Sequence, residues 1–196
     1  MDDYTGVTNM IPCFDAIRLI ETLRGDALVV STCTPSQYWQ DVSSREDLDI
    51  SLPGTMGKAS SLALGLALAT PEKKIIVLDG DGSILMNLGS LITVSGSQSR
   101  NFIHFVFEDR EYYTTGSQPI PGAGISNIAE IGNSSGYKST KEYKDIEIFK
   151  NDLPEILAST GPVLVTLLVN HPDKVPPFKI NPKKTLLHMK EALTNQ

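Results

Sequence analysis

Cysteine is scarce in this sequence, and its two cysteines, Cys13 and Cys33, make neither a disulfide framework nor a zinc site. No apolar run is long enough to span a bilayer, and the start Met1-Asp2-Asp3 lacks the basic residues that open a signal peptide. Basic residues are also too few for nucleic acid to be the main partner, because a net charge of −6 disfavours a phosphate backbone. We therefore expect a cytoplasmic protein that binds neither membranes nor nucleic acid.

Two common phosphate-binding motifs are missing as well. The chain contains no Gly-Lys-Ser/Thr run of the P-loop type, and Leu85 stands where a dinucleotide-binding fingerprint needs its third glycine. The chain does contain Gly80-Asp81-Gly82-Ser83, directly after an apolar run over 74–78 that predicts a buried strand. Gly-Asp-Gly is most often only a turn. It also places Asp81 at the carboxyl end of a strand, where open α/β sheets bind ligands, with Ser83 as a cap for the next helix.

A second carboxylate is expected at the same edge. Apolar residues recur at helical spacing over 83–98, and the apolar run 102–107 predicts another buried strand. A strand, a helix and a strand form a right-handed crossover, so both strands are parallel and end at one edge. Asp109 follows the second strand as Asp81 follows the first. Two carboxylates, a main-chain carbonyl, diphosphate oxygens and water complete the octahedral shell that Mg²⁺ prefers, so we predict a magnesium diphosphate site.

The whole chain alternates between strand-like and helix-like segments. Its 196 residues suffice for one buried core, and the alternation predicts an α/β fold of three layers, a parallel sheet with helices on both faces. Strands are expected at 27–31, 74–78, 102–107 and 162–169, and helices at 13–23, 57–69, 83–98, 126–132 and 146–159. We expect a domain over residues 1–170, with a proline-rich arm and short helix over 171–196 as part of it.

These motifs resemble the diphosphate-binding domain of thiamine-diphosphate enzymes, whose signature is Gly-Asp-Gly, a helix, a strand and a closing polar pair. The resemblance is greatest to sulfopyruvate decarboxylase beta subunits and the C-terminal domain of phosphonopyruvate decarboxylases. Residues 80–91 are similar to that group's Gly-Asp-Gly-Ser and Met-Asn-Leu-Gly-Ser-Leu, 112–119 to its Tyr-x-Ser-Thr-Gly-x-Gln-Pro, and 54–61 to its Gly-Ser-Met-Gly-x-Ala-Ser-Ser. The resemblance covers Phe14 to Val169 and implies the thiamine diphosphate-binding fold, with thiamine diphosphate and Mg²⁺ as cofactors.

The resemblance also implies roles for single residues. Asp81 corresponds to the first metal ligand, Asp109 to a second ligand that is normally asparagine, and the main-chain carbonyl of Glu111 to the third. The extra charge of Asp109 beside a diphosphate is expected to alter metal affinity or preference. The residues implied in cofactor binding are Ser31, Thr32, Thr34, Gly54, Met56, Gly80, Gly82, Ser83, Tyr113 and Thr114.

Several of these residues also have a simpler interpretation. Met56 opens an apolar helical run and is nearly as well explained by core packing, and Ser31 and Thr32 are equally well explained by capping of a helix. Tyr113 stands where the similar proteins have a small residue and is expected to narrow the substrate channel. The histidines show no spacing that suggests a partner, and we interpret all three as structural or exposed: His104, His171 and His188.

The resemblance further implies a partner chain. In this family the glutamate that activates the cofactor lies on a pyrimidine-binding domain, and a chain of this length does not hold both domains. We expect no catalytic residue here but the diphosphate-binding subunit of a hetero-oligomeric 2-oxo acid decarboxylase. Its substrate is expected to be a small anionic 2-oxo acid, similar to sulfopyruvate or phosphonopyruvate, with Lys58 or Arg110 as candidates for anion contact. Two alternatives stay open: a carboligase subunit, and a cofactor-binding module that regulates a partner without turnover.

Overall fold

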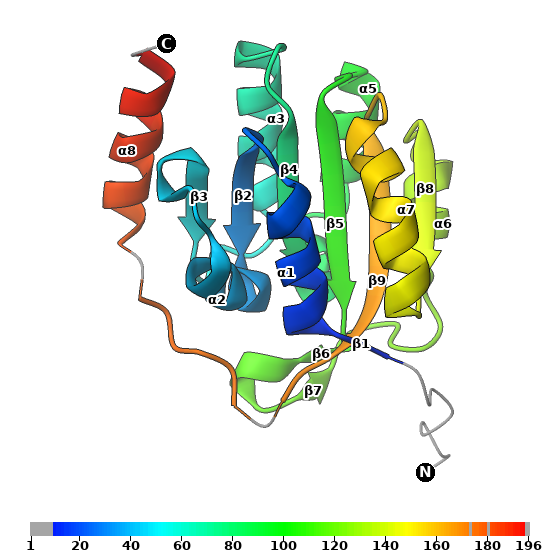
Figure 1. The fold of residues 1–196 in the computed structure, drawn as a ribbon. Coiled ribbons are helices and arrows are strands. Elements are labelled where there is room, and N and C mark those ends of the chain that lie inside the picture. The colour runs from blue at the N-terminus through cyan, green and yellow to red at the C-terminus, as the bar shows by residue number, and fades with distance from the viewer. Residues whose placement is uncertain (1–9, 173, 180, 195–196) are drawn as a thin grey trace.

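One seven-stranded sheet forms the centre of the computed structural model, which describes residues 10–172, 174–179 and 181–194 (Figure 1). Its strands are β1 (Ile11–Pro12), β2 (Leu28–Thr32), β3 (Asp49–Leu52), β4 (Ile75–Gly80), β5 (Phe102–Glu108), β8 (Ser139–Tyr143) and β9 (Val163–Asn170). The order across the sheet is β1-β9-β5-β4-β2-β3, with β8 beside β9, and each of these pairs is parallel. The parallel sheet that the alternating pattern predicts is confirmed.

Helices cover both faces of this sheet (Figure 1). The face toward the viewer carries α1 (Cys13–Leu23), α2 (Cys33–Val42) and α7 (Ile146–Ala158), and the opposite face carries α3 (Ala59–Ala69), α5 (Ser90–Ser97) and α6 (Ile128–Ser134). At the far edge, α8 (Pro182–Thr194) packs against β3. The predicted three-layer architecture is therefore confirmed.

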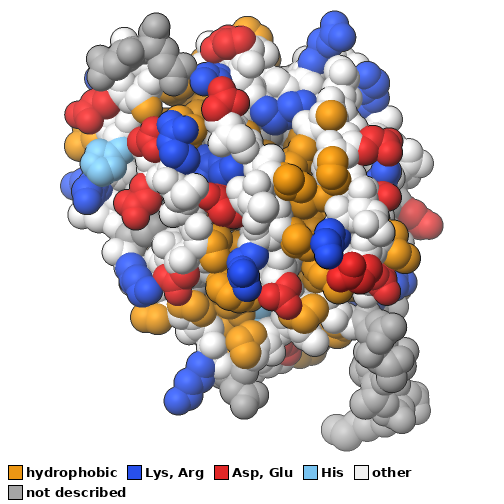
Figure 2. Space-filling view, in the orientation of Figure 1, with side chains coloured by type: hydrophobic (Ala, Val, Ile, Leu, Met, Phe, Trp, Pro, Cys, Tyr) orange, Lys and Arg blue, Asp and Glu red, His pale blue; other side chains and the backbone are white. Residues whose placement is uncertain are grey.

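The sheet separates two apolar cores. The first lies under α1, α2 and α7 and includes the fully buried Ile17, Trp39 and Phe149. The second lies under α3, α5 and α6 and includes Ala63 and Val94. Because helices cover both faces, β2 and β5 are buried along their whole length, which is why apolar residues make up most of both strands. Figure 2 shows acidic and basic side chains interspersed over the face that carries α1, α2 and α7.

The single helix predicted over 83–98 is wrong. The chain forms the short helix α4 (Asp81–Leu85), a turn over residues 86–89, and then α5. Asn87 anchors this turn, because its side-chain amide donates to the carbonyl oxygen of Gly57 at 3.1 Å. The cap of α4 is Gly80, so Ser83 does not cap the helix as expected. Instead, the Ser83 hydroxyl oxygen accepts a hydrogen bond from the main-chain N–H of Gly57 at 3.0 Å.

Three elements have sequences too polar to show apolar periodicity, namely α2, β3 and β8. Their polar groups find partners elsewhere in the fold. In β3, Asp49 accepts a hydrogen bond from Nη1 of the buried Arg24 at 2.7 Å, while Nη2 of Arg24 donates to the carbonyl oxygen of Ala27 at 2.7 Å. In α2, the buried Ser36 hydroxyl donates to Ser51 Oγ at 3.0 Å. A local pattern carries no sign of such distant partners.

The C-terminal arm lies on α2 of its own chain. Nε2 of Gln37 donates to the carbonyl oxygen of Pro176 at 2.7 Å. Gln40 donates to the carbonyl oxygen of Pro177 at 2.6 Å and accepts from the main-chain N–H of Lys179 at 2.8 Å. The arm thus runs from the carboxyl end of β9 along α2 to α8 (Figure 1).

The structure bears on the expected absence of a membrane span but not on the expected absence of a signal peptide. Within the described part of the chain, no helix combines the length and the apolar character needed to cross a membrane. Met1, Asp2 and Asp3, on which the expectation about a signal peptide depends, lie outside the described residues.

Candidate active site at the carboxyl edge of the sheet

Asp81 and Asp109 lie at the same edge of the sheet. Strands β4 and β5 are adjacent and parallel, and their register pairs Gly80 with Phe107, so both strands end together at the lower edge in Figure 1. Each strand is followed at once by its aspartate. The crossover predicted from the sequence therefore brings the two carboxylates to one place.

Asp81 is held deep in this edge, with 2 % of its surface exposed. Its Oδ1 accepts a hydrogen bond from the N–H of Gly82 at 2.7 Å, and its Oδ2 accepts one from the N–H of Arg110 at 2.7 Å. Burial and then the negative charge of Asp109 raise the pKa of Asp81 to about 8, although both main-chain donors act in the opposite direction. A divalent cation bound by both carboxylates would relieve this repulsion.

Asp109 is oriented by two donors from other elements. Its Oδ1 accepts from the N–H of Glu111 at 3.2 Å, and its Oδ2 lies 2.9 Å from Nε2 of His171. Glu111 belongs to β6 (Glu111–Tyr112), which pairs antiparallel with β7 (Gln118–Pro119). No three His, Cys, Asp or Glu side chains in the described ranges group as metal ligands. A cation held by two carboxylates would take its other ligands from main-chain and ligand oxygens.

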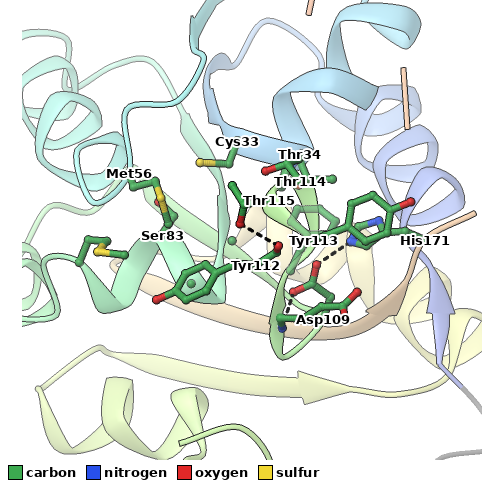
Figure 3. Close-up of a pocket in the computed structure, with 16 residues that line it drawn as sticks. Cys33, Thr34, Met56, Ser83, Asp109, Tyr112, Tyr113, Thr114, Thr115 and His171 are labelled. Carbon is green, nitrogen blue, oxygen red and sulfur yellow. Dashed lines mark hydrogen bonds and ion pairs between the residues drawn. The ribbon is translucent and has the colours of Figure 1, made fainter. Parts of the chain in front are cut away.

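A cavity of about 310 Å³ opens at this edge of the sheet, with Asp109 in its lining (Figure 3). This volume is at the lower end of the range for small-molecule sites. One wall comes from the first turn of α2 and from Met56, and the opposite wall comes from β6 and the following turn over Tyr113–Thr115. Sequence-predicted residues that line the cavity are Thr34, Met56, Gly80, Gly82, Ser83, Asp109, Glu111, Tyr113 and Thr114.

Four residues implied by the resemblance lie off the cavity wall: the buried Asp81, and Ser31, Thr32 and Gly54. Ser31 is fully buried in β2, and its hydroxyl pairs with that of Ser51 at 3.2 Å. The Thr32 hydroxyl donates to the carbonyl oxygen of Leu52 at 2.9 Å, so it is engaged within the protein. Gly54 lies in the exposed loop before α3, with a φ of +66° that favours glycine.

Neither predicted anion contact lies on the cavity wall. Arg110 Nε pairs with Glu108 Oε1 at 3.1 Å and lines a different, smaller cavity. Lys58 is exposed at the start of α3.

Among the lining residues that the sequence did not single out for this site are Cys33, Tyr112 and His171. Tyr112 packs on Gly82, where an added Cβ would come within 2.6 Å of its Cε1 atom, so this position of the turn needs glycine. His171 directly follows β9, which pairs with β5, and it therefore reaches the same edge as Asp109. The position of His171 after a predicted strand was the signal available in the sequence.

The donor set of the cavity suits a diphosphate with its cation. Thr32 caps α2 without a side-chain hydrogen bond, and Cys33, Thr34 and Pro35 at the start of this ten-residue helix line the cavity. The start of a helix suits an anion, although Pro35 has no N–H to donate. Asp109 lines the opposite side of the cavity (Figure 3). At Gly80, an added Cβ would meet nothing within 4 Å, so the bare main chain leaves open space beside the carboxylates. A helix start and a carboxylate on opposite sides of one cavity suit a metal diphosphate.

Comparison with known proteins agrees with this geometry. Residues 31–167 match the thiamine pyrophosphate enzyme, C-terminal TPP binding domain family. Sulfopyruvate decarboxylase subunit beta of Methanocaldococcus jannaschii is 38 % identical, over 74 % of this chain and 81 % of that protein. Phosphonopyruvate decarboxylase of Streptomyces viridochromogenes is 34 % identical over 78 % of this chain, but over only 38 % of that longer protein.

A solved structure has the same fold. Benzoylformate decarboxylase from Polynucleobacter necessarius superposes with a TM-score of 0.71 over 91 % of this chain and 36 % of that chain, at 20 % sequence identity. This likeness concerns the fold alone. The match over residues 31–167 shows that the chain belongs to the thiamine pyrophosphate enzymes, as a C-terminal TPP binding domain of that family.

Proposed function

We propose that this chain is the diphosphate- and Mg²⁺-binding subunit of a two-chain, thiamine-diphosphate-dependent decarboxylase. The observation that carries the proposal is the pairing of the buried Asp81 with the partly buried Asp109 at the ends of adjacent strands, where Asp109 lines the cavity. The relatives named sulfopyruvate and phosphonopyruvate decarboxylase support a small anionic 2-oxo acid as the substrate.

In this proposal each residue has a simple physical task. Asp81, Asp109 and the main-chain carbonyl of Glu111 hold the cation, whose remaining positions take diphosphate oxygens and water. The first turn of α2 and the Ser83 hydroxyl bind the diphosphate. Met56, Phe107 and Tyr112 provide apolar walls that keep water from the reacting part of the cofactor. Bound thiamine diphosphate supplies the electron sink that makes loss of CO₂ from a 2-oxo acid feasible.

The partner subunit is proposed to bind the outer surface of the helical layer that contains α3 and α5. Residues 59–71 and 82–99 contain no charged side chain, in contrast to the mixed charges of the face in Figure 2. Large apolar side chains are exposed on these two segments: Leu68 by 61 %, Met86 by 57 % and Ile92 by 65 %. Met86 also lines the cavity, so a chain seated on this face would close the cavity at the same time. Such a partner would bring the glutamate that the family uses on the pyrimidine ring.

Titration calorimetry with thiamine diphosphate, with and without Mg²⁺, tests the cofactor site. We expect heat only when Mg²⁺ is present, and none for Asp81→Ala. Asp26→Ala is the matched control, because Asp26 is an aspartate whose side chain is 75 % exposed and paired only with a lysine. A wild-type chain that gives no heat, or an Asp81→Ala chain that binds as wild type, refutes the proposal.

Reconstitution with the copurifying partner tests the activity and the interface. The complex is expected to release CO₂ and the corresponding aldehyde from sulfopyruvate or phosphonopyruvate, whereas a ligated product would indicate carboligation. Ile92→Lys should abolish association, because a charge would be buried in the interface. Leu23→Lys on α1, at a position that is 45 % exposed, should associate normally. Equal association of both variants would place the partner elsewhere.

A further inference from the structure

The geometry points to His171 as a positioning residue that fixes Asp109 for metal binding, with Tyr38 holding the imidazole in the required tautomer. This inference rests on the cation site proposed above. It concerns a residue outside every motif that the sequence analysis singled out, and it assigns a task to the start of the C-terminal arm.

His171 connects three other elements at the carboxyl edge. It follows β9, and its Nε2 lies 2.9 Å from Oδ2 of Asp109 at the end of β5. Its Nδ1 lies 3.2 Å from the hydroxyl of Tyr38 on α2. Its ring packs between two aromatic rings, parallel to Tyr38 with centroids 5.8 Å apart and tilted against Tyr113 at 4.8 Å. With only 3 % of the side chain exposed, the imidazole has little freedom to turn away (Figure 3).

The partners of the imidazole determine which nitrogen donates. A carboxylate accepts hydrogen bonds, so the proton that faces Asp109 belongs to Nε2 of His171. In the neutral imidazole Nδ1 is then the acceptor, and the Tyr38 hydroxyl at 3.2 Å donates to it. The result is a directed chain of hydrogen bonds from Tyr38 through His171 to Asp109. A second partner on the far nitrogen is the usual means by which proteins fix a histidine tautomer.

This chain of hydrogen bonds restricts how Asp109 presents its oxygens. His171 holds Oδ2, and the N–H of Glu111 holds Oδ1 at 3.2 Å, so the plane of the carboxylate is set from both sides. Mg²⁺ demands near-ideal octahedral geometry, whereas Ca²⁺ accepts flexible coordination with more ligands. Loss of the His171 hydrogen bond should therefore harm Mg²⁺ binding more than Ca²⁺ binding. Partners of this kind typically change metal affinity by about 10- to 100-fold.

The arm next to His171 keeps its main chain in place. The Tyr113 hydroxyl donates to the carbonyl oxygen of Pro172 at 2.6 Å, and Gln37 holds Pro176 on α2. Because these contacts involve other residues than the imidazole, the task of the arm and the task of the His171 side chain can be separated by mutation.

The test is a Mn²⁺ titration followed by electron paramagnetic resonance, with thiamine diphosphate present and with Mg²⁺ or Ca²⁺ as competitors. For His171→Ala we expect Mg²⁺ affinity to fall about 10- to 100-fold, with a smaller loss for Ca²⁺. His171→Gln, which retains a side-chain N–H donor, should recover part of the loss. Tyr38→Phe should also lose more affinity for Mg²⁺ than for Ca²⁺, but the loss should be smaller than in His171→Ala. His188→Ala removes a histidine of α8, and Gln40→Ala loosens the arm; both should bind as wild type.

A double-mutant cycle separates positioning from general damage. In the Asp109→Ala background, adding His171→Ala should change Mg²⁺ affinity by no more than about twofold, the scatter of independent sites, because no side-chain oxygen remains to be oriented. An equal loss in both backgrounds, or an equal loss for Mg²⁺ and Ca²⁺, overturns the inference while leaving the cation site intact. A wild-type chain that binds no Mn²⁺ overturns the proposed function and this inference with it. If His171→Ala does not fold, the inference is tested by comparing the Mg²⁺ and Ca²⁺ affinities of His171→Gln and Tyr38→Phe with those of the wild type.

Discussion

Asp81 links the stability of the metal-free protein to pH. The pKa of this carboxyl is raised from its ordinary value of 3.8 to about 8, first by burial and second by the charge of Asp109. Between these two values the unfolded chain has lost the proton and the folded chain keeps it. The stabilising effect of this proton is therefore complete below about pH 4 and is lost as the pH rises toward about 8.

The size of the effect follows from proton linkage. Over the window in which the two states differ by one proton, Asp81 lowers the free energy of unfolding by about 1.4 kcal/mol for each pH unit. Asp81→Asn removes the titrating group but keeps a side-chain oxygen for the N–H of Arg110. We therefore expect the metal-free wild type to lose stability more steeply with rising pH than Asp81→Asn does.

Urea unfolding in the presence of a chelator, at several values from about pH 5 to about pH 8, measures both slopes. The difference between wild type and variant is the informative quantity, because other buried acids titrate equally in both. Asp26→Asn is the control, since the pKa of Asp26 is lowered by its hydrogen bond to Lys73. Mg²⁺ with thiamine diphosphate should flatten the wild-type slope, because the cation favours the ionised pair. Parallel slopes for wild type and Asp81→Asn would refute this account of the carboxylate pair.

Three other perturbations give clear expectations. The Cys33 thiol lines the cavity, and burial raises its pKa, so its reaction with a disulfide reagent should accelerate as the pH rises. Adding thiamine diphosphate and Mg²⁺ should slow this reaction; equal rates with and without the cofactors would place the cofactor elsewhere. Gly82→Ala brings a methyl group within 2.6 Å of Tyr112, so urea unfolding should show a loss of about 1–3 kcal/mol that is smaller in a Tyr112→Ala background. Arg24→Met leaves the buried Asp49 without its 2.7 Å partner and should cost roughly 3–5 kcal/mol, whereas Arg24→Met with Asp49→Leu should recover much of it.

The sequence alone determined the layers of this protein and the place of its central carboxylates. Apolar runs such as residues 75–78 and 102–107 are buried on both sides, so their whole length is apolar and visible without structural knowledge. Asp81 and Asp109 follow these runs directly, and the right-handed crossover leaves only one edge where both can end. This much is local pattern combined with a general rule of chain handedness.

The tertiary structure alone decided how the site is completed. His171 is 62 residues from Asp109 in sequence, and only the pairing of β9 with β5 brings the two within a hydrogen bond. The break in the helix predicted over 83–98 likewise depends on Asn87 reaching Gly57, which no periodicity reveals. Polar side chains form such contacts with whichever groups the fold brings near, whereas apolar side chains need only be buried. Periodicity therefore locates the sheet and its helices, and the polar partners of the site are known only once the chain is folded.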